Sequence, residues 1–475
     1  MDDIKTSKLG RIAEQIREFV VKKRDISTTQ MIAFGFLVAI LIGSVLLALP
    51  ISAADGKATN YVDALFTATT TTCVTGLTTV TTATHWSLFG KVVIMLLIQF
   101  GGLGIVTFTT TILLALRRRI TLKERLLIQD AYNLDTLKGL VKLTIKIIKG
   151  TLLIEGIGAV FYAIQFIPEY GLLKGIGCSI FTSISAFCNA GVDLVGDSSF
   201  VPYQTNVLIN INTMVLIILG GIGFPVWWDI IHTGKKLKNG HIKKEKLFNK
   251  LELHTKIVLT TTLILILLGA ILTFAIEYDN PNTIGNMSFG NKVLTSFFQS
   301  VSTRTAGFAT IPQQNFEQGS SFLYLILMFI GGSPSGTAGG IKTVTIAVLI
   351  LAMWSSIRNK QDVEVYHRRI TDNYVKKAAT VAGISILVLF TSTLLLTITE
   401  QADFLDIIYE STSAIATVGL TRGITTELSE LGKIIIIVTM YLGRIGPITM
   451  ALAFNARKKT CSNSRKLPAD KILVG

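Results

Sequence analysis

Apolar runs recur along this chain from one end to the other, beginning with Met31–Pro50 and ending around Lys433–Phe454. A helix needs roughly 20 consecutive apolar residues to cross the hydrocarbon core of a bilayer. Half of the 475 residues are apolar, which is unusual for a soluble protein. The sequence therefore predicts an integral membrane protein. Because residues 1–30 are polar and no small-residue cleavage site follows Pro50, we expect the first span to be retained.

The formal net charge is +15, and most of the 45 Lys and Arg residues fall in five segments: 1–30, 117–149, 235–256, 358–377 and 457–475. These segments lie on one side of the membrane if each block between them crosses twice. That arrangement is the positive-inside pattern, so we expect both termini of a multi-pass plasma membrane protein in the cytoplasm. Aromatic residues do not interleave the basic clusters, which argues against a nucleic-acid partner.

Four glycines in Ser- and Thr-rich segments recur at intervals of 112 to 116 residues: Gly76, Gly191, Gly307 and Gly419. An aromatic residue lies ten positions before each of them: Phe66, Phe181, Phe297 and Tyr409. A second group of glycines follows about 25 residues later, at 101–104, 220–223, 331–332 and 443–446, with Arg444 in place of the second glycine of the last group. The chain therefore contains four copies of one unit.

Each unit is predicted to be a span, a short pore helix, a glycine turn and a second span. The fold class is thus an all-α membrane protein with eight transmembrane helices and four re-entrant pore loops around one pseudo-fourfold pore. The spans are expected at 31–49, 88–116, 141–167, 206–232, 256–277, 321–355, 376–399 and 433–455. The domains are a cytoplasmic segment 1–30, four repeats and a cytoplasmic tail 456–475, the repeats covering 31–116, 141–232, 256–355 and 376–455.

The four glycine turns are the candidate ion-binding site. Non-helical backbone at membrane depth survives only where it is buried in protein or lines a water-filled cavity, and four such loops around one axis do both. Glycine adopts positive φ without a Cβ clash, so successive carbonyls can point at the axis and replace the hydration shell of an ion. The predicted filter residues are Val74, Thr75, Gly76, Asn189, Ala190, Gly191, Thr305, Ala306, Gly307, Thr417, Val418 and Gly419.

These four tetrads resemble the degenerate potassium filter of the Trk/Ktr/HKT superfamily, and the string Ser-Thr-Arg-Thr-Ala-Gly-Phe at 302–308 most resembles that of the KtrB-type membrane subunit. The resemblance implies potassium uptake, a homodimer and a cytoplasmic RCK/KtrA-type nucleotide-binding ring. It also implies K+ as the transported ion, since glycine in all four filter positions goes with potassium in this superfamily. Na+ is a candidate coupling or activating ion, and no organic cofactor is expected in this chain.

The second span of the third repeat is too long for one crossing, and five glycines and a proline interrupt it. A simple kink against a neighbouring helix is one interpretation. The family resemblance implies a mobile loop that obstructs the pore beneath the filter. The candidate gate residues are Gly331, Gly332, Ser333, Pro334, Ser335, Gly336, Thr337, Ala338, Gly339, Gly340 and Arg444. The Lys342-Thr343 pair that follows imitates a phosphate-binding loop, but Ile341 separates the lysine from the last glycine, which argues against that function.

Arg444 lies at mid-span, where a charge normally faces a cavity or a partner and is functional. A structural alternative, compatible with a gate, is a buried arginine that caps freed carbonyls of the broken third-repeat helix. The other repeats carry Gly102, Gly221 and Gly332 at this level and are expected to leave open space there. Arg304 is expected to anchor its loop to an acidic neighbour. Glu155 is a second intramembrane charge with no assigned role.

Three other functions were weighed. A sodium-selective or sodium-coupled transporter would share this architecture. An alternating-access solute carrier would need broken helices in paired positions, whereas the sequence predicts only one broken helix. An enzyme would need an intramembrane catalytic cluster, and the five histidines lie at span ends or in loops. The sequence therefore favours a pore over a carrier and excludes an enzyme.

Overall fold

The computed structural model describes residues 28–104, 107, 140–196, 198–241 and 243–446. Within these ranges, four helices are long and apolar enough to cross a membrane. They are α2 (Thr28–Ala48), α8 (Leu140–Tyr170), α13 (Leu253–Glu277) and α17 (Asp372–Thr399). Large apolar side chains on α17 remain exposed, including Leu387 at 66% and Ile398 at 74%. Such surfaces are stable against lipid, so the chain is a membrane protein.

Four shorter helices follow these long ones in the chain: α3 (Tyr61–Cys73), α9 (Leu172–Cys188), α14 (Phe289–Ser302) and α18 (Phe404–Ala416). Their carboxyl-terminal halves are buried. Just beyond each helix stands a residue with φ between 51° and 65°, namely Val74, Asn189, Thr305 and Thr417. This left-handed conformation ends α3, α9 and α18 directly and turns the chain back, whereas α14 ends at Ser302, three residues before Thr305.

A third group of helices comes next: α5 (Leu88–Leu103), α10 (Val207–Gly221), α15 (Gln318–Phe329) and α19 (Glu430–Ile445). Three of them stop at or just before a glycine of positive φ, which is 80° at Gly104, 89° at Gly223 and 87° at Gly446. After α15 the chain is non-helical until α16 (Thr343–Ile357). The break expected inside 321–355 is therefore present.

The span expected at 206–232 is not one straight helix. The helix stops at Gly221 and α11 (Phe224–Lys238) leaves at an angle of 97°. The positive φ of Gly223 redirects the chain, and no L side chain adopts that value at low cost. The expectation that only one helix of the chain is broken is wrong for the same reason.

Hydrogen bonds tie the end of each long helix, or the turn directly after it, to the start of the third-group helix that follows. The pairs are the Ser87 N–H to the Ser52 carbonyl at 2.8 Å, the Asn206 amide to Gln165 at 3.1 Å, the Glu317 N–H to the Glu277 carboxylate at 3.0 Å and the Ser429 N–H to the Glu400 carboxylate at 3.0 Å. These bonds use side chains and backbone donors that a helix start leaves unpaired. The two helices of each pair are thus joined at one end.

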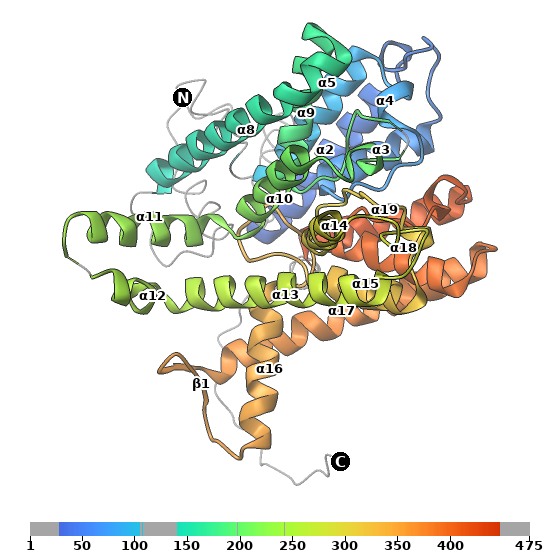
Figure 1. The fold of residues 1–475 in the computed structure, drawn as a ribbon. Helices are drawn as coiled ribbons and strands as arrows, with labels where there is room; N and C mark the ends of the chain where they lie inside the picture. The colour runs from blue at the N-terminus through green and yellow to red at the C-terminus, as the bar shows by residue number, and fades with distance from the viewer. Residues whose placement is uncertain (1–27, 105–106, 108–139, 197, 242, 447–475) are drawn as a thin grey trace, which may run out of the picture.

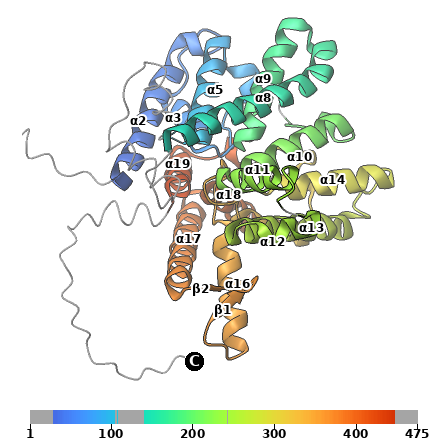
Figure 2. The same ribbon diagram turned by 90° about the vertical axis from the view of Figure 1, so that its left-hand side faces the viewer.

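The remaining elements are short. They are η1 (Pro50–Ser52), α4 (Thr82–His85), η2 (Val201–Tyr203), η3 (Lys244–Lys246), α12 (Leu247–Lys250), η4 (Gln313–Asn315), η5 (Ile424–Thr426) and the antiparallel pair β1 (Val363–Val365) and β2 (Arg368–Ile370). The strand hairpin lies beside α16, which contacts α13 and α17 and extends below them (Figure 1). The turned view shows α16, α17 and the hairpin extending together below the rest (Figure 2).

Several sequence expectations lie outside the described residues. They concern most of segment 1–30, the end of the span expected at 88–116, the basic segment 117–139, the end of the span expected at 433–455 and the tail 456–475.

Candidate functional site

The four repeated glycines form a closed ring. Each has positive φ, with values of 99°, 65°, 80° and 93° along the chain. A Cβ atom added to Gly76 would lie 2.6 Å from the Ala190 oxygen, and the corresponding distances are 2.7 Å from Gly191 to the Ala306 oxygen and 2.5 Å from Gly307 to the Val418 oxygen. A Cβ on Gly419 would collide with the Thr75 oxygen, which returns the sequence of contacts to the first loop. No side chain fits at these positions.

The ring brings together the filter residues expected from the sequence. Eleven of the twelve are buried and Gly191 is partly buried. The segments that follow the glycines line a pocket of about 390 Å³, whose walls include Thr78, Asp193, Gln313 and Thr425. Polar and apolar side chains both line the pocket, and Asp193 is its one carboxylate among the described lining residues. Burial raises the pKa of Asp193 to about 6, although the Val195 N–H donates to its carboxylate at 3.1 Å.

The segment 331–340 contacts the other face of the ring, against residues that precede the glycines. The Gly339 N–H donates to Thr305 Oγ1 at 3.1 Å, and the Thr337 hydroxyl donates to Asn189 Oδ1 at 3.1 Å. A Cβ on Gly339 would collide with Thr417 Oγ1. Three of the four loops therefore hold this segment directly beneath the candidate filter.

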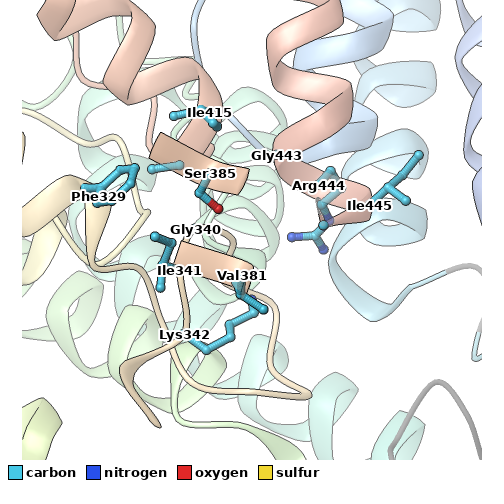
Figure 3. Close-up of a pocket in the computed structure, with 12 residues that line it drawn as sticks. Phe329, Gly340, Ile341, Lys342, Val381, Ser385, Ile415, Gly443, Arg444 and Ile445 are labelled. Atoms are coloured by element: carbon cyan, nitrogen blue, oxygen red, sulfur yellow. The ribbon is translucent and has the colours of Figure 1, made fainter. Parts of the chain in front are cut away.

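Arg444 joins the segment to two other parts of the chain. Its Nη1 donates to the Thr337 oxygen at 2.6 Å, and its Nη2 donates to the Gly101 oxygen at the end of α5. Arg444 lines a second pocket, and Figure 3 shows its guanidinium pointing away from Ile445 toward the side of that pocket that carries Gly340. This second pocket has a volume of about 250 Å³ and shares no lining residue with the first.

Lys342 is a further basic residue of this site, and its sequence context predicted no role for it. Its Nζ donates to the Ala338 oxygen at 2.7 Å and to the Gly339 oxygen at 3.3 Å, and it lines the same pocket as Arg444 (Figure 3). A lysine at the end of a glycine-rich helix break was the available signal, because freed carbonyls attract a cation. The two cations together bind the carbonyls of 337, 338 and 339.

Two expectations about charges and space are wrong. Arg304 has no acidic neighbour among the described residues: it donates from Nη2 to the Leu327 carbonyl at 2.6 Å. A carbonyl freed near the end of α15 supplies the acceptor that a carboxylate was expected to supply. Gly102 and Gly332 do not leave open space, because an added Cβ would collide with Cys188 Sγ and with Ala338.

Glu155, which had no assigned role, is only 4% exposed. Its carboxylate accepts from the Gln99 amide at 3.3 Å and lies 3.9 Å from the Cys188 thiol, next to the second filter loop. In the segment that follows the fourth ring glycine, Arg422 pairs with Asp406 at 2.5 Å and donates to the Gln313 oxygen at 3.0 Å. Ionisable side chains therefore contact the residues next to two of the loops.

The fold and this site define a helical integral membrane protein whose loops meet in a closed ring of glycines. The TrkH family model, described as cation transport protein, matches residues 14–464. The chain belongs to this family of cation transport proteins, and it is therefore a transporter rather than an enzyme.

Curated relatives match over nearly the full length. The Ktr system potassium uptake protein B of Bacillus subtilis is 39% identical over 459 residues, which cover 97% of this chain and 99% of the relative. The potassium/sodium uptake protein NtpJ of Enterococcus hirae is 38% identical and is covered to 98%. The crystal structure of the potassium transporter TrkH from Vibrio parahaemolyticus has a TM-score of 0.69 at 19% identity, covering 90% of this chain and 86% of that one. That match shows a shared fold.

Proposed function

We propose that this chain takes up potassium across the plasma membrane through the ring of four glycine loops. The ring itself carries the proposal, since each glycine lies against the backbone oxygen of the next loop. Carbonyls brought this close around one axis can replace the hydration shell of a monovalent cation. The filter residues expected from the sequence lie at this ring of glycines and carbonyls. The names of the relatives, which are potassium uptake proteins, agree with this choice of ion.

The proposed architecture is four units of span, pore helix, filter loop and span. Long helix, short buried helix and third helix occur in this order four times, starting at α2, α8, α13 and α17. The hydrogen bond that joins the first helix to the third in each unit supports the same division. With eight crossings, the basic segments lie on one side, and both termini are cytoplasmic.

The segment 331–340 and Arg444 are the proposed gate. The segment lies under three of the four loops, and the guanidinium is fixed to its backbone. At an effective dielectric constant of about 20, two unit charges about 4 Å apart interact by ~4 kcal/mol. Arg444 therefore both holds the obstruction and repels a cation that leaves the filter. Flux requires the segment to move.

The proposed partners come from the relatives rather than from the geometry. The name "Ktr system" indicates a transporter that works with other subunits, which agrees with a cytoplasmic RCK/KtrA-type nucleotide-binding ring on a homodimer. One relative is named for potassium and sodium together, so Na+ is proposed as a coupling or activating ion.

An alternating-access carrier is the second candidate. The 97° bend between α10 and α11 adds a broken helix in a second unit, which removes one argument against a carrier. The closed ring still favours a pore, because a carrier needs no four-membered ring of carbonyls.

Growth of a potassium-uptake-deficient bacterium on low potassium tests the function. Expression of this chain, with and without an RCK-type partner, is expected to restore growth. The comparison strain expresses the Gly76→Ser variant at the same membrane abundance as the parent chain. Failure of the parent chain to restore growth, or to take up rubidium, in either setting would refute potassium uptake.

A further inference from the structure

Three of the four short helices carry a buried hydroxyl six residues before the ring glycine. Thr70 Oγ1 accepts from the Gly76 N–H at 3.0 Å, and Ser413 Oγ accepts from the Gly419 N–H at 3.0 Å. Ser185 Oγ accepts from the N–H of Val192, the residue after the ring glycine, at 3.1 Å. All three side chains have an exposed fraction of 0%. The same position thus accepts from a backbone N–H in three loops, that of the ring glycine in two of them and that of the next residue in the third.

These bonds decide where the neighbouring carbonyls point. In a trans peptide the N–H and the C=O point in opposite directions. The Gly76 N–H is held toward the short helix, so the Thr75 carbonyl on the same peptide points the other way. That oxygen lies against Gly419, in the ring. By the same geometry, Ser413 turns the Val418 carbonyl toward Gly307.

The third loop is built differently. The position six residues before Gly307 is Val301, which has no hydroxyl. The next residue, Ser302, donates its hydroxyl to the Phe308 oxygen at 2.5 Å. It therefore holds a carbonyl behind the loop instead of an N–H. The ring is supported by three acceptor hydroxyls and one donor hydroxyl.

We propose that Thr70, Ser185 and Ser413 are positioning residues that set the discrimination between potassium and sodium, an inference that rests on the proposed pore. Without the hydroxyl, the N–H of Gly76, Gly419 or Val192 loses its buried partner, and its peptide gains freedom to rotate. A rotated peptide withdraws its carbonyl from the ring. The binding free energy of potassium then falls more than that of the smaller and more strongly hydrated sodium ion, because potassium depends on the full set of oxygens.

The test measures sodium competition against rubidium uptake in cells that express the full chain. Thr70→Val and Ser413→Ala remove a hydroxyl from two different loops, so one loop remains informative if the other variant fails to fold. Thr70→Ser keeps the hydroxyl. Thr69→Ala and Thr412→Ala are matched controls, because those hydroxyls donate to carbonyls of their own helices, Leu65 and Ile408, both at 2.7 Å.

We expect Thr70→Val and Ser413→Ala to reduce discrimination by about fivefold, the factor that corresponds to a hydrogen bond of about 1 kcal/mol. Thr70→Ser and both controls should match the parent chain. Unchanged discrimination in a folded hydroxyl-deleting variant, or an equal loss in the controls, would overturn the inference. If Gly76→Ser alters discrimination while these variants do not, the pore stands and the inference fails. If the parent takes up no rubidium, the proposed function itself fails.

Discussion

The Nη1 atom of Arg444 donates a 2.6 Å hydrogen bond to the backbone oxygen of Thr337, and this contact joins the end of α19 to the segment beneath the glycine ring. The two residues are 107 positions apart in the chain. A guanidinium keeps its charge at any accessible pH and offers donors in a rigid fork. The contact therefore persists for as long as the segment stays in place.

Replacement of Arg444 is expected to raise ion flux. Arg444→Gln removes the charge and part of the fork, so rubidium flux into proteoliposomes without a partner protein should rise several-fold. Arg444→Lys keeps the charge and loses the fork, and a smaller rise is expected. Lys433→Gln on the same helix is the control, since Lys433 pairs with Asp63 at 2.8 Å and not with the segment. Parent-like conduction by both folded Arg444 variants would make Arg444 a structural anchor.

Deletion of 333–338 should also raise flux through the isolated membrane subunit, because it removes the backbone that lies under the loops. Thr337→Val is a milder version that removes the hydroxyl donated to Asn189 and keeps the shape of the side chain. We expect a large rise for the deletion and a smaller one for Thr337→Val, measured as liposome flux. A correctly folded deletion with unchanged flux would return the segment to a simple kink.

Gly76→Ser should weaken discrimination between potassium and sodium. The new Cβ would lie 2.6 Å from the Ala190 oxygen, at a φ of 99° that strains an L residue, so the second loop must shift. Sodium competition against rubidium uptake is the measurement. Gly56→Ser is the control, because Gly56 has a similar backbone with φ of 71° but no neighbour within 4 Å. Equal ratios of apparent affinity in Gly76→Ser and the parent would contradict the filter assignment.

Uptake at low substrate concentration should fall as external pH drops through about 6. Burial raises the pKa of Asp193 to about 6, so its carboxylate is charged above that pH and attracts cations into the pocket, and it becomes neutral below that pH. The titratable groups that interact with it are Tyr162 of α8 and Cys178 of α9, whose ordinary pKa values lie far above 6.

Asp193→Asn should take up rubidium at the low-pH rate of the parent and lose the dependence on pH. Asp55→Asn, at an exposed loop position, should keep the parent profile. A parent profile that stays flat between pH 5 and pH 7, or one that Asp193→Asn leaves unchanged, would contradict the role of this carboxylate.

Local patterns predicted the short helices and the glycine turns well, because a Ser- and Thr-rich helix followed by a glycine has few alternatives at membrane depth. The pattern did not predict the bend after α10. Gly104 and Gly223 occur in the nearly identical strings Gly-Gly-Leu-Gly and Gly-Gly-Ile-Gly, and such strings were expected inside a continuous span.

Contacts between residues far apart in the chain were also not predictable from the sequence. The acceptor of Arg304 is a backbone carbonyl, which carries no signal in the sequence, so a carboxylate was expected instead. The positions of Thr70, Ser185 and Ser413 could be identified from the sequence, since aligning the four glycines also aligns these three residues. The alignment does not show the hydrogen-bond partner of each hydroxyl. Only the folded loop shows that the hydroxyl accepts from a backbone N–H.

The order of the four loops around the ring equals their order along the chain. Each glycine meets the oxygen of the loop that comes next in sequence, and the fourth meets the first. The arrangement therefore has one rotational sense, set by the linear order of the units. An engineered chain that exchanged the second and third units would give three of the four glycines a different neighbour, and only Gly419 would still meet the Thr75 oxygen. By contrast, a shift of the starting point that preserved the cyclic order would keep all four pairings.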